Sequence, residues 1–348
     1  MYKVTLSMPI YNVAPYVERA LLSALNQTFE SIEFLLVDDK GTDNSMEIVR
    51  RIIKDHPRGK DVRIIEHPYN IGTGATKNTA IDNAQGEFLF FMDSDDEITP
   101  DCIQLLYDKM KEDNVDFVAG SFTRCKGGRN NVIQDCILPD LTIREDKALA
   151  KYYYYKMNVF YVPTWNKLYN LSFIKKNNIR CISYHINEDL LFLFRIALNS
   201  HSFSLVSNVT YYYYLIDNST TVVQSKIGES IKSINQYKDV ISAMRLSCFY
   251  SDSDYYYYGY LFVDNYLMNI INISFSLIKS KMISIVDKRE MLKYYCDVSS
   301  LSPFSVKPNI FYIKLFYCFL KKSNNYNYTC VCVYFFKYLH LLIRKMKM

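Results

Sequence analysis

Two aspartates, Asp93 and Asp95, have the residue type and the spacing to hold a metal ion. They follow an apolar run, Glu87–Met92, that predicts a buried strand. In an extended backbone, side chains two residues apart point to the same side. Two carboxylates on one side repel each other unless a cation lies between them, and oxygen ligands suit hard ions such as Mg²⁺ or Mn²⁺. The spacing therefore predicts a divalent metal site at the end of this strand.

A helix cap is the alternative role for these aspartates, because Asp and Ser often cap helices and form turns. For the helix that follows, however, we expect Thr99 to be the N-cap and Pro100 to lie in the first turn. The carboxylates of Asp93, Asp95 and Asp96 are then not needed for capping, which favours the metal site.

Two other loops have residues suited to ligand binding. Asp38 and Asp39 end an apolar run, where a turn is one possibility and acceptance of hydrogen bonds from a base or ribose by Asp38 is the other. Gly72 and Gly74 match part of the dinucleotide fingerprint, but Lys77 stands at its third glycine position. The fingerprint also belongs after the first strand, so we exclude a dinucleotide-dependent dehydrogenase.

The elements that must position these loops alternate between strands and helices. The expected strands are Lys3–Met8, Ile32–Val37, Val62–Glu66, Glu87–Met92 and Val115–Ala119. The expected helices are Ala14–Asn26, Ser45–Lys54, Thr73–Ala84 and Pro100–Glu112. Strands that are apolar throughout are typical of parallel sheets covered on both faces. The pattern predicts a doubly wound α/β domain with a mostly parallel sheet and helices on both faces. Ligands bind at the carboxyl edge of such sheets, where the loops after the first four strands meet.

Composition limits the possible functions. The 348 residues include 41 Lys and Arg against 36 Asp and Glu, a net charge of +5 that gives no reason to expect a nucleic-acid partner. Nine scattered cysteines without a CxxC pair indicate reduced thiols in the cytoplasm and no structural zinc. The 32 tyrosines include three runs of four, which we interpret as compositional bias and not as a repeat.

The C-terminal third has a different character. Strand patterns end near residue 215, and residues 216–300 predict helices. Residues 301–348 form a basic, aromatic tail with eight basic and no acidic side chains. Its two apolar stretches, Ile310–Leu320 and Thr329–Ile343, contain lysines and are too short to span a bilayer. They fit either a helix lying on an anionic membrane surface or a pair of helices packed on the first domain.

Several sequence blocks together resemble family 2 glycosyltransferases with a GT-A fold. They cover about residues 1–215 and occur in the order typical of the family. The blocks are Ser7–Asn12, Leu25–Phe29, Val37–Ser45, Gly86–Asp96, Trp165–Tyr169 and Asn187–Leu190. The fourth block contains the DxD metal motif.

The resemblance implies an inverting transferase that moves a sugar from a nucleotide-sugar, UDP-linked in our expectation, to a saccharide or lipid-linked acceptor in surface polysaccharide synthesis. Residues 1–215 would form the catalytic domain. On the donor side, Pro9, Tyr11, Asn12 and Asp38 would hold uracil and ribose, and Asp93, Ser94 and Lys77 would lie at the ribose and diphosphate. Asp95, with Asp93, would bind Mn²⁺ or Mg²⁺. Asp189 would be the general base, with Glu188 as the alternative. Both acids would also suit a helix N-terminus.

Lys77 departs from the family pattern, and two roles are open for each of two other residues. Lys77 replaces the arginine usual in the family, so it keeps the charge but loses the bidentate fork. Trp165, the single tryptophan, is either an acceptor-side stacking residue or a core anchor. His185 could reach the metal or the acceptor, or it could have a structural role.

Two other functions remain as alternatives, a non-catalytic nucleotide-binding homologue and a sugar nucleotidyltransferase. Retention of Asp93, Asp95 and Asp189 argues against the first, since a non-catalytic homologue would be expected to lose one of them. Pro9–Asn12 is neither glycine-rich nor basic, which argues against the second. The sequence favours a cytoplasmic enzyme, peripheral on the inner face of the membrane if its tail binds lipid.

Overall fold

The computed structural model describes most of the first two thirds of the chain and separate parts of the last third. The described residues are 2–155, 160–183, 188–216, 236, 239–240, 242–244, 267–268, 270–281, 283–295 and 326–346. The chain divides into two units, Met1–Leu149 with Tyr161–Ile216, and Ala150–Phe160 with Asp217–Met348. The division after Ile216 falls one residue beyond the boundary predicted at residue 215. A separate tail from residue 301 stays a prediction.

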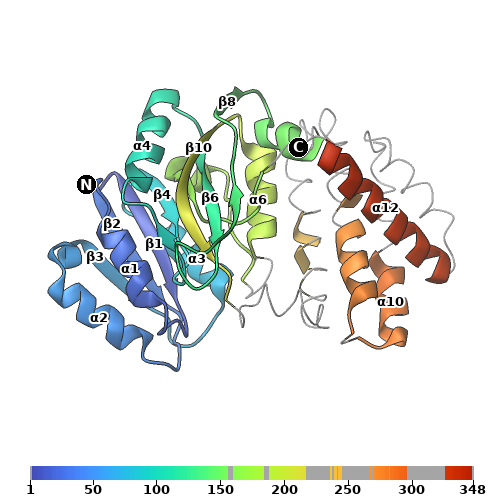
Figure 1. Cartoon of the computed structure of the whole chain (residues 1–348), viewed down its shortest axis with the longest axis horizontal. Helices are drawn as coiled ribbons and strands as arrows, with labels where there is room; N and C mark the ends of the chain where they lie inside the picture. The colour runs from blue at the N-terminus through green and yellow to red at the C-terminus, as the bar shows by residue number, and fades with distance from the viewer. Residues whose placement is uncertain are drawn as a thin grey trace. The chain divides into compact units, whose positions relative to one another are not determined.

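Ten strands of the described residues form one sheet in the first unit (Figure 1). The strands are β1 Val4–Ile10, β2 Ile32–Asp38, β3 Val62–Glu66, β4 Phe88–Phe91, β5 Glu97–Ile98, β6 Phe117–Cys125, β7 Val132–Cys136, β8 Leu141–Arg144, β9 Lys167–Asn170 and β10 Ser202–Tyr214. Their order is β3-β2-β1-β4-β9-β6-β10-β5, with β7 beside β6 and β8 beside β10.

The sheet is parallel in its first half and mixed in its second half. Strands β3, β2, β1 and β4 are parallel neighbours, as the apolar runs predict. Beyond them, β9 lies antiparallel between β4 and β6, and β6 pairs with β10 in parallel. Since β4 and β6 both run antiparallel to β9, they run in the same direction. The carboxyl ends of β1, β2, β4 and β6 therefore lie at one edge, where the functional loops begin.

Helices cover both faces of this sheet. The helices of the first unit are α1 Val17–Leu25, α2 Ser45–Asp55, α3 Thr73–Asn83, α4 Cys102–Asp113, α5 Leu171–Lys176 and α6 Glu188–Asn199. Helices α1, α2 and α4 bury their apolar sides in one continuous core with β1, β2 and β4. Helix α3 contacts both α5 and α6, and these helices cover the opposite face. The alternation of strand and helix in the first third is as predicted.

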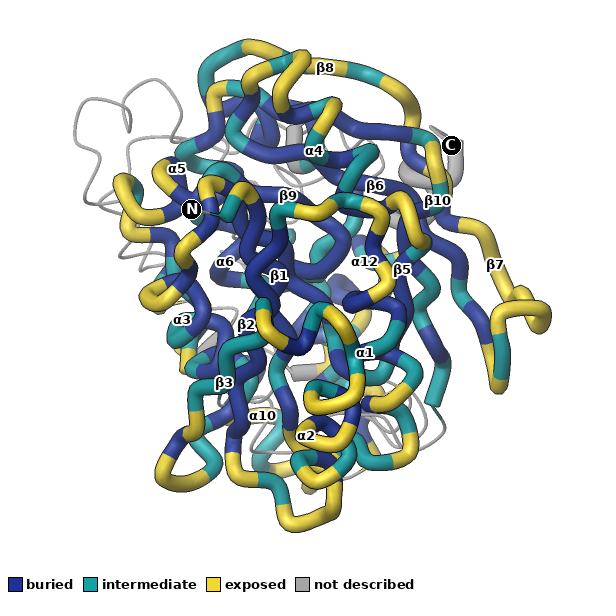
Figure 2. The backbone as a smooth tube through the Cα atoms, turned by 90° about the vertical axis from the view of Figure 1, so that its left-hand side faces the viewer, coloured by how far each residue is buried: buried dark blue, intermediate teal, exposed yellow. Residues whose placement is uncertain are grey.

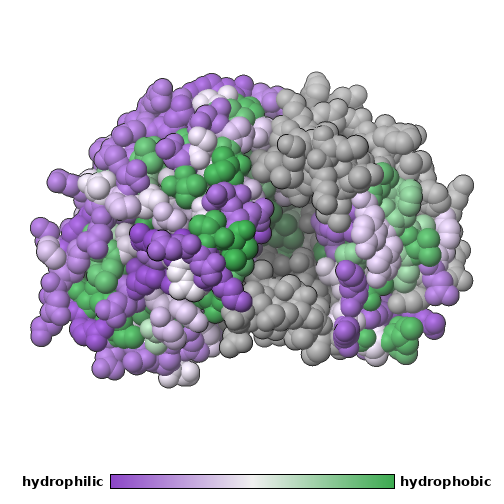
Figure 3. All heavy atoms as spheres, in the orientation of Figure 1, coloured by the Kyte–Doolittle hydropathy of each residue, from purple (hydrophilic) through white to green (hydrophobic). Residues whose placement is uncertain are grey.

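Burial follows this arrangement. All seven residues of β2 are buried, because it is a central strand covered on both faces (Figure 2). By contrast, four of the five residues of β7 are exposed. Figure 3 shows that hydrophilic residues cover much of the visible surface of the first unit.

The predicted cap of α4 is wrong. The helix begins at Cys102 after Asp101, whose side chain makes no capping hydrogen bond. Thr99 lies before the helix, because its backbone N–H donates to the carbonyl of Thr210 (3.0 Å) and holds it beside β10. The capping argument therefore does not bear on Asp93 and Asp95, whose role depends on geometry instead.

The described part of the second unit is helical. It includes α10 Ile285–Tyr295, α12 Tyr326–Met346, helical residues 270–279 and a π-helical turn, Ala150–Tyr155. Within it, Lys337 of α12 donates to the side-chain oxygen of Asn272 (2.6 Å), and the rings of Phe275 and Tyr334 are in contact. None of the helices in the described residues combines the length and the apolar character that crossing a membrane requires. The predicted apolar stretch Ile310–Leu320 lies outside the described residues.

Candidate active site

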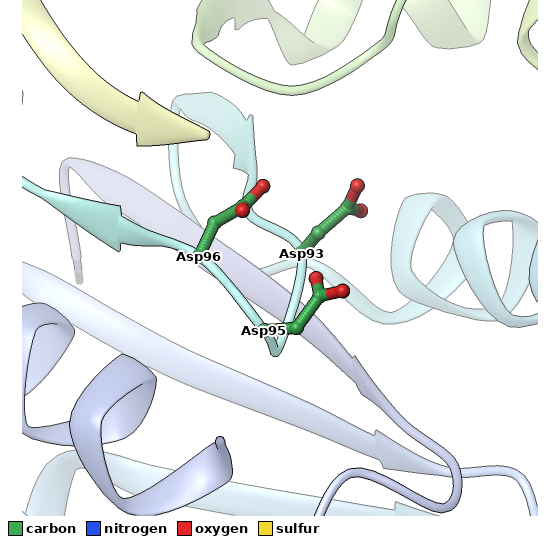
Figure 4. Close-up of side chains that lie close together, drawn as sticks. All are labelled: Asp93, Asp95 and Asp96. Atoms are coloured by element: carbon green, nitrogen blue, oxygen red, sulfur yellow. The ribbon is translucent and has the colours of Figure 1, made fainter. Parts of the chain in front are cut away.

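The loop between β4 and β5 holds three aspartates close together. Carboxylate oxygens of Asp93, Asp95 and Asp96 all lie within 4.8 Å of one another (Figure 4). The parallel pairing of β4 with β1 places this loop at the carboxyl edge of the sheet. The predicted spacing of Asp93 and Asp95 thus brings two carboxylates to one place.

Asp96 differs from the other two aspartates. It is fully buried, and both its oxygens accept hydrogen bonds, one from the Tyr211 hydroxyl (2.8 Å) and one from the Tyr214 backbone N–H (2.8 Å). Asp93 and Asp95 are contacted through their backbone, by Tyr211 and Arg19 respectively, and within the described residues no side chain donates a hydrogen bond to their carboxylates. The two predicted metal ligands are therefore the ones left available.

The electrostatics of this loop suit a cation. Burial, together with the neighbouring charge of Asp95, raises the pKa of Asp93 to about 7, although the charge of Lys77 opposes the shift. Burial likewise raises the pKa of the Asp95 carboxyl. Two carboxylates that are costly to ionise side by side become stable as anions when a divalent ion binds between them. The donor set fits a hard divalent cation such as Mn²⁺ or Mg²⁺.

A buried ion pair joins α3 to α6. The Lys77 ammonium of α3 donates to the Glu188 carboxylate of α6 at 2.9 Å, and both side chains are buried. Burial alone would lower the pKa of Lys77, but Glu188, Asp93 and Asp189 raise it above its ordinary value. The structure thus brings four predicted site residues into one electrostatic cluster.

Close packing of α3 explains how this cluster forms. A Cβ on Gly74 would lie 1.8 Å from the backbone oxygen of Ile182 and 3.0 Å from the Cβ of Glu188. Asn78, one turn further along α3, contacts the same segment. Its side chain accepts a hydrogen bond from the backbone N–H of Cys181 and donates one to the Cys181 carbonyl, both at 2.9 Å. Glycine at position 74 thus allows α3 to approach the chain that leads to α6.

Asp189 is the half-buried acid at the start of α6. Burial raises its pKa to about 6, with a further contribution from Glu188, while Lys77 opposes the shift. Its carboxylate is not part of the Lys77 ion pair, whereas that of Glu188 is. Of the two acids, Asp189 is therefore the one free to accept a proton.

The predicted donor residues occupy the ends of β1 and β2. Pro9 lies in β1 opposite Val37, and Tyr11 follows with 43% of its surface exposed. Asn12 adopts a left-handed conformation and accepts from the backbone N–H of Thr42 (2.7 Å), so its side-chain oxygen ties the two loops together. Tyr11 is accordingly an exposed ring at the sheet edge, and Asn12 supports the loop.

The two adjacent aspartates of β2 have separate environments. Asp38 is buried and accepts from the backbone N–H of Lys40 (2.9 Å). Asp39 accepts from His67 Nδ1 (2.8 Å) and from the backbone N–H groups of Ile71 and Gly72 (2.9 Å each). Asp39 therefore holds the loop before α3, and the donor-side role of Asp38 stays a prediction.

The remaining predicted residues have different surroundings. Ser94 is buried within the aspartate loop. Trp165 is 6% exposed and stacks on Tyr211 with ring centroids 4.5 Å apart, as its core-anchor alternative predicts. His185 lies outside the described residues.

Comparison with known proteins settles the family. The model of "Glycosyl transferase family 2" matches residues 5–196, which span the sheet edge and both acidic clusters. The chain belongs to glycosyl transferase family 2. Two relatives of this glycosyltransferase have names that specify a transferase activity. It is 28% identical over 312 residues to a cholesterol galactosyltransferase of Borreliella burgdorferi, covering 85% of this chain and 86% of the relative. It is 29% identical to the poly(ribitol-phosphate) β-N-acetylglucosaminyltransferase TarP of Staphylococcus aureus, covering 69% and 72%.

Solved structures confirm the GT-A fold of this glycosyltransferase. The structure of S. aureus TarS residues 1–349 in complex with UDP-GlcNAc has a TM-score of 0.56 at 19% identity and covers 87% of this chain and 76% of that one. The mannosyltransferase PcManGT of Pyrobaculum calidifontis, in complex with GDP-Man and Mn²⁺, has a TM-score of 0.51 at 14% identity and covers 96% and 86%. At these identities the likeness concerns the fold.

Two residues of this glycosyltransferase were missed by the sequence argument. Lys167 of β9 is buried, and burial lowers its pKa to about 7 while the charge of Asp189 opposes the shift. Tyr211 contacts the aspartate loop directly. Lys167 lies in a block that the family resemblance had already marked, whereas Tyr211 was hidden in a run of four tyrosines.

Proposed function

We propose that this chain is a metal-dependent, inverting glycosyltransferase. It would transfer a sugar from a UDP-linked donor to a saccharide or lipid-linked saccharide acceptor in surface polysaccharide synthesis. Support for a nucleotide-sugar donor comes from TarS, which was solved with UDP-GlcNAc. Support for polymer or lipid acceptors comes from the names of the relatives, TarP and the cholesterol galactosyltransferase.

One observation carries this proposal. The pair Asp93 and Asp95 and the acid Asp189 share one electrostatic cluster, in which the charges of both Asp93 and Asp189 act on Lys77. A displacement with inversion needs a stabilised leaving group on one side of the sugar and a base on the other. These acids are suited to the two tasks, and their neighbours on the sheet edge are suited to holding a nucleotide.

The donor would lie along the carboxyl edge of the sheet. Pro9, Tyr11 and Asp38 would hold the uracil and the ribose, since they provide an apolar surface, an exposed ring and a hydrogen-bond acceptor at the ends of β1 and β2. Asp95 and Asp93 would hold Mn²⁺ or Mg²⁺, which when bound stabilises the charge that develops on the departing diphosphate.

Asp189 would then act as the general base. The acceptor hydroxyl oxygen bonds to the anomeric carbon as its proton passes to the Asp189 carboxylate, and the electron pair of the breaking bond leaves with the diphosphate. Glu188 is the alternative base, but its ion pair with Lys77 favours Asp189. Because the described site offers one base and no separate nucleophile, we expect the product to have the inverted anomeric configuration.

A panel of nucleotide-sugars tests the proposal. We expect at least one UDP-sugar to show Mn²⁺-dependent hydrolysis and saturation-transfer NMR contacts with the wild-type protein, and GDP- or CMP-sugars to show weaker ones. Binding without turnover under any condition would instead support the non-catalytic homologue. A retained anomer in the transfer product would exclude the inverting mechanism.

We also propose that α12 attaches the enzyme to an anionic membrane surface on the cytoplasmic side. Its large exposed apolar side chains, Tyr328, Val331, Phe335 and Tyr338, are spaced three or four residues apart and so share one helix face. Arg344 and Lys345 near its end add positive charge. An apolar face with basic residues is typical of a helix that lies in the membrane interface. Such a position would suit a lipid-linked acceptor.

A further inference from the structure

We propose that Tyr211 is a positioning residue for the loop that carries Asp93, Asp95 and Asp96. Its hydroxyl holds this loop in place and occupies the Asp96 carboxylate, so that Asp96 does not bind the cation. This inference rests on the metal site of the proposed function and names the residue that decides which of three adjacent carboxylates serve as ligands. Tyr211 belongs to the tyrosine run Tyr211–Tyr214, which from sequence alone looked like compositional bias.

The Tyr211 hydroxyl contacts both ends of the aspartate loop. It accepts a hydrogen bond from the backbone N–H of Asp93 (3.1 Å) and donates one to the carboxylate of Asp96 (2.8 Å). A single oxygen atom therefore joins the first and the last aspartate of the loop and fixes the turn between them.

The tyrosine itself is held firmly. Its side chain is fully buried, and its ring stacks on Trp165 at 4.5 Å with an angle of 9° between the planes. Its backbone pairs with Ile98 of β5, just beyond the loop. Because strand pairing and stacking both constrain the ring, the hydroxyl has a defined position from which to hold the loop.

A second set of contacts holds the other side of the loop. The Arg19 guanidinium donates to the backbone carbonyl of Asp95 (2.6 Å) and lies 3.6 Å from the centre of the Tyr214 ring. The Tyr214 hydroxyl donates to Glu97 (2.5 Å), and its backbone N–H donates to Asp96. Both tyrosines at the ends of the run thus contact the loop that carries the candidate metal ligands.

The three aspartates therefore have different roles. Asp96 uses one oxygen for Tyr211 and the other for Tyr214, so it is an internal acceptor. The side chains of Asp93 and Asp95 receive no such donor from the described residues. Without the Tyr211 hydroxyl, the backbone N–H of Asp93 loses its acceptor, and Asp96 gains freedom to compete for the ion.

The proposal can be tested without an activity assay. The affinity of the full-length protein for Mn²⁺ in the presence of UDP is measured by electron paramagnetic resonance. Tyr211→Phe keeps the stacked ring and removes only the hydroxyl. We expect it to weaken Mn²⁺ binding by about tenfold, the scale of a lost buried hydrogen bond. Tyr212→Phe is the matched control, since the Tyr212 hydroxyl makes no hydrogen bond with the described residues, and it should stay within about twofold of wild type.

Asp96→Asn provides a second variant that keeps the side-chain shape. As an internal acceptor, Asp96 should matter less to Mn²⁺ binding than Asp95, so Asp96→Asn should retain measurable binding where Asp95→Asn does not. Equal Mn²⁺ affinity in Tyr211→Phe and wild type would overturn the positioning role. Loss of binding in Asp96→Asn as complete as in Asp95→Asn would make Asp96 a ligand and also overturn it. Absence of Mn²⁺ binding in wild type would instead remove the metal from the proposed function, and this inference with it.

Discussion

The Lys77 ammonium lies 2.9 Å from the Glu188 carboxylate, although 111 residues separate them in the chain. The pair joins α3 to α6 and is almost completely buried. A lysine is a point charge that one carboxylate can satisfy, whereas the arginine that the family resemblance led us to expect would present a fork of donors. The pair therefore fixes Glu188 in the structure and separates its role from that of Asp189.

Breaking the ion pair by removing one partner should lower the stability of the fold more than removing both partners. Lys77→Met leaves Glu188 buried without its partner, and Glu188→Leu leaves Lys77 in the same condition, so each should cost about 3–5 kcal/mol in the free energy of unfolding. The double variant removes both charges and should lose less than either single variant. Urea unfolding of the four proteins measures this coupling. A double-variant loss equal to the sum of the two single losses would show that the residues do not interact.

Asp189→Asn should separate donor binding from transfer. The amide keeps the size of the side chain but cannot take a proton, so transfer should fall by about 10²–10⁴-fold while donor affinity stays near that of wild type. Glu188→Gln is the neighbouring comparison, and its transfer rate should fall less. If Glu188→Gln were inactive and Asp189→Asn active, the roles of the two acids would be exchanged.

The pH dependence should report Asp189. Burial raises its pKa to about 6, and a base works only when deprotonated. At saturating donor and metal, kcat/KM for the acceptor should therefore be constant above pH 7 and fall about tenfold per pH unit well below pH 6. The residual activity of Asp189→Asn should lack this acidic limb. A wild-type profile that stays flat down to pH 5 would assign the base elsewhere.

Removal of the metal should stop transfer. EDTA should abolish activity, and Mn²⁺ should restore it, because Asp93 and Asp95 carry the negative charges that a divalent ion would neutralise. Asp95→Asn should lower turnover by at least about 10²-fold, the scale of lost electrostatic stabilisation. Asp101 is exposed and lies just before α4, so Asp101→Asn is the matched control and should leave turnover nearly unchanged. Full activity in EDTA would contradict metal dependence.

Liposome sedimentation should reveal the membrane contact. The double change Val331→Ser and Phe335→Ser replaces two side chains of the exposed face of α12, which are 67% and 58% exposed. It should reduce binding to anionic vesicles several-fold, and high salt should weaken but not eliminate wild-type binding. Ile285→Ser with Val286→Ser, equally exposed on α10, is the control. Equal sedimentation of both double variants would exclude this face as the contact.

Local sequence patterns predicted much of the fold. Strand β3 has the predicted bounds, and β1, β2 and β4 differ from theirs by one or two residues, because continuous apolar runs mark buried parallel strands clearly. The mixed second half was not predicted. Strand β9 is a four-residue strand placed between β4 and β6 by long-range pairing, for which periodicity gives no signal.

The candidate site shows the same division. Asp93 and Asp95 were predicted from their spacing, which depends on local backbone geometry alone. Asp38 was singled out from Asp39 as a donor-binding residue, but the role of Asp39 was not predicted, because it depends on His67 and two backbone N–H groups beyond β3. Nor could the sequence show that Tyr211 reaches Asp96, since the contact spans 115 residues and requires the β5–β10 pairing.

Gly74 has a consequence for the sequences that can serve as this enzyme. A methyl group there would collide with a backbone carbonyl, which cannot rotate aside as a flexible side chain can. Any larger residue must therefore move the chain near Ile182, and with it the start of the helix that carries both acids. Position 74 should therefore tolerate few substitutions, because a larger residue there would change the distance between the pair Asp93 and Asp95 and the proposed base Asp189.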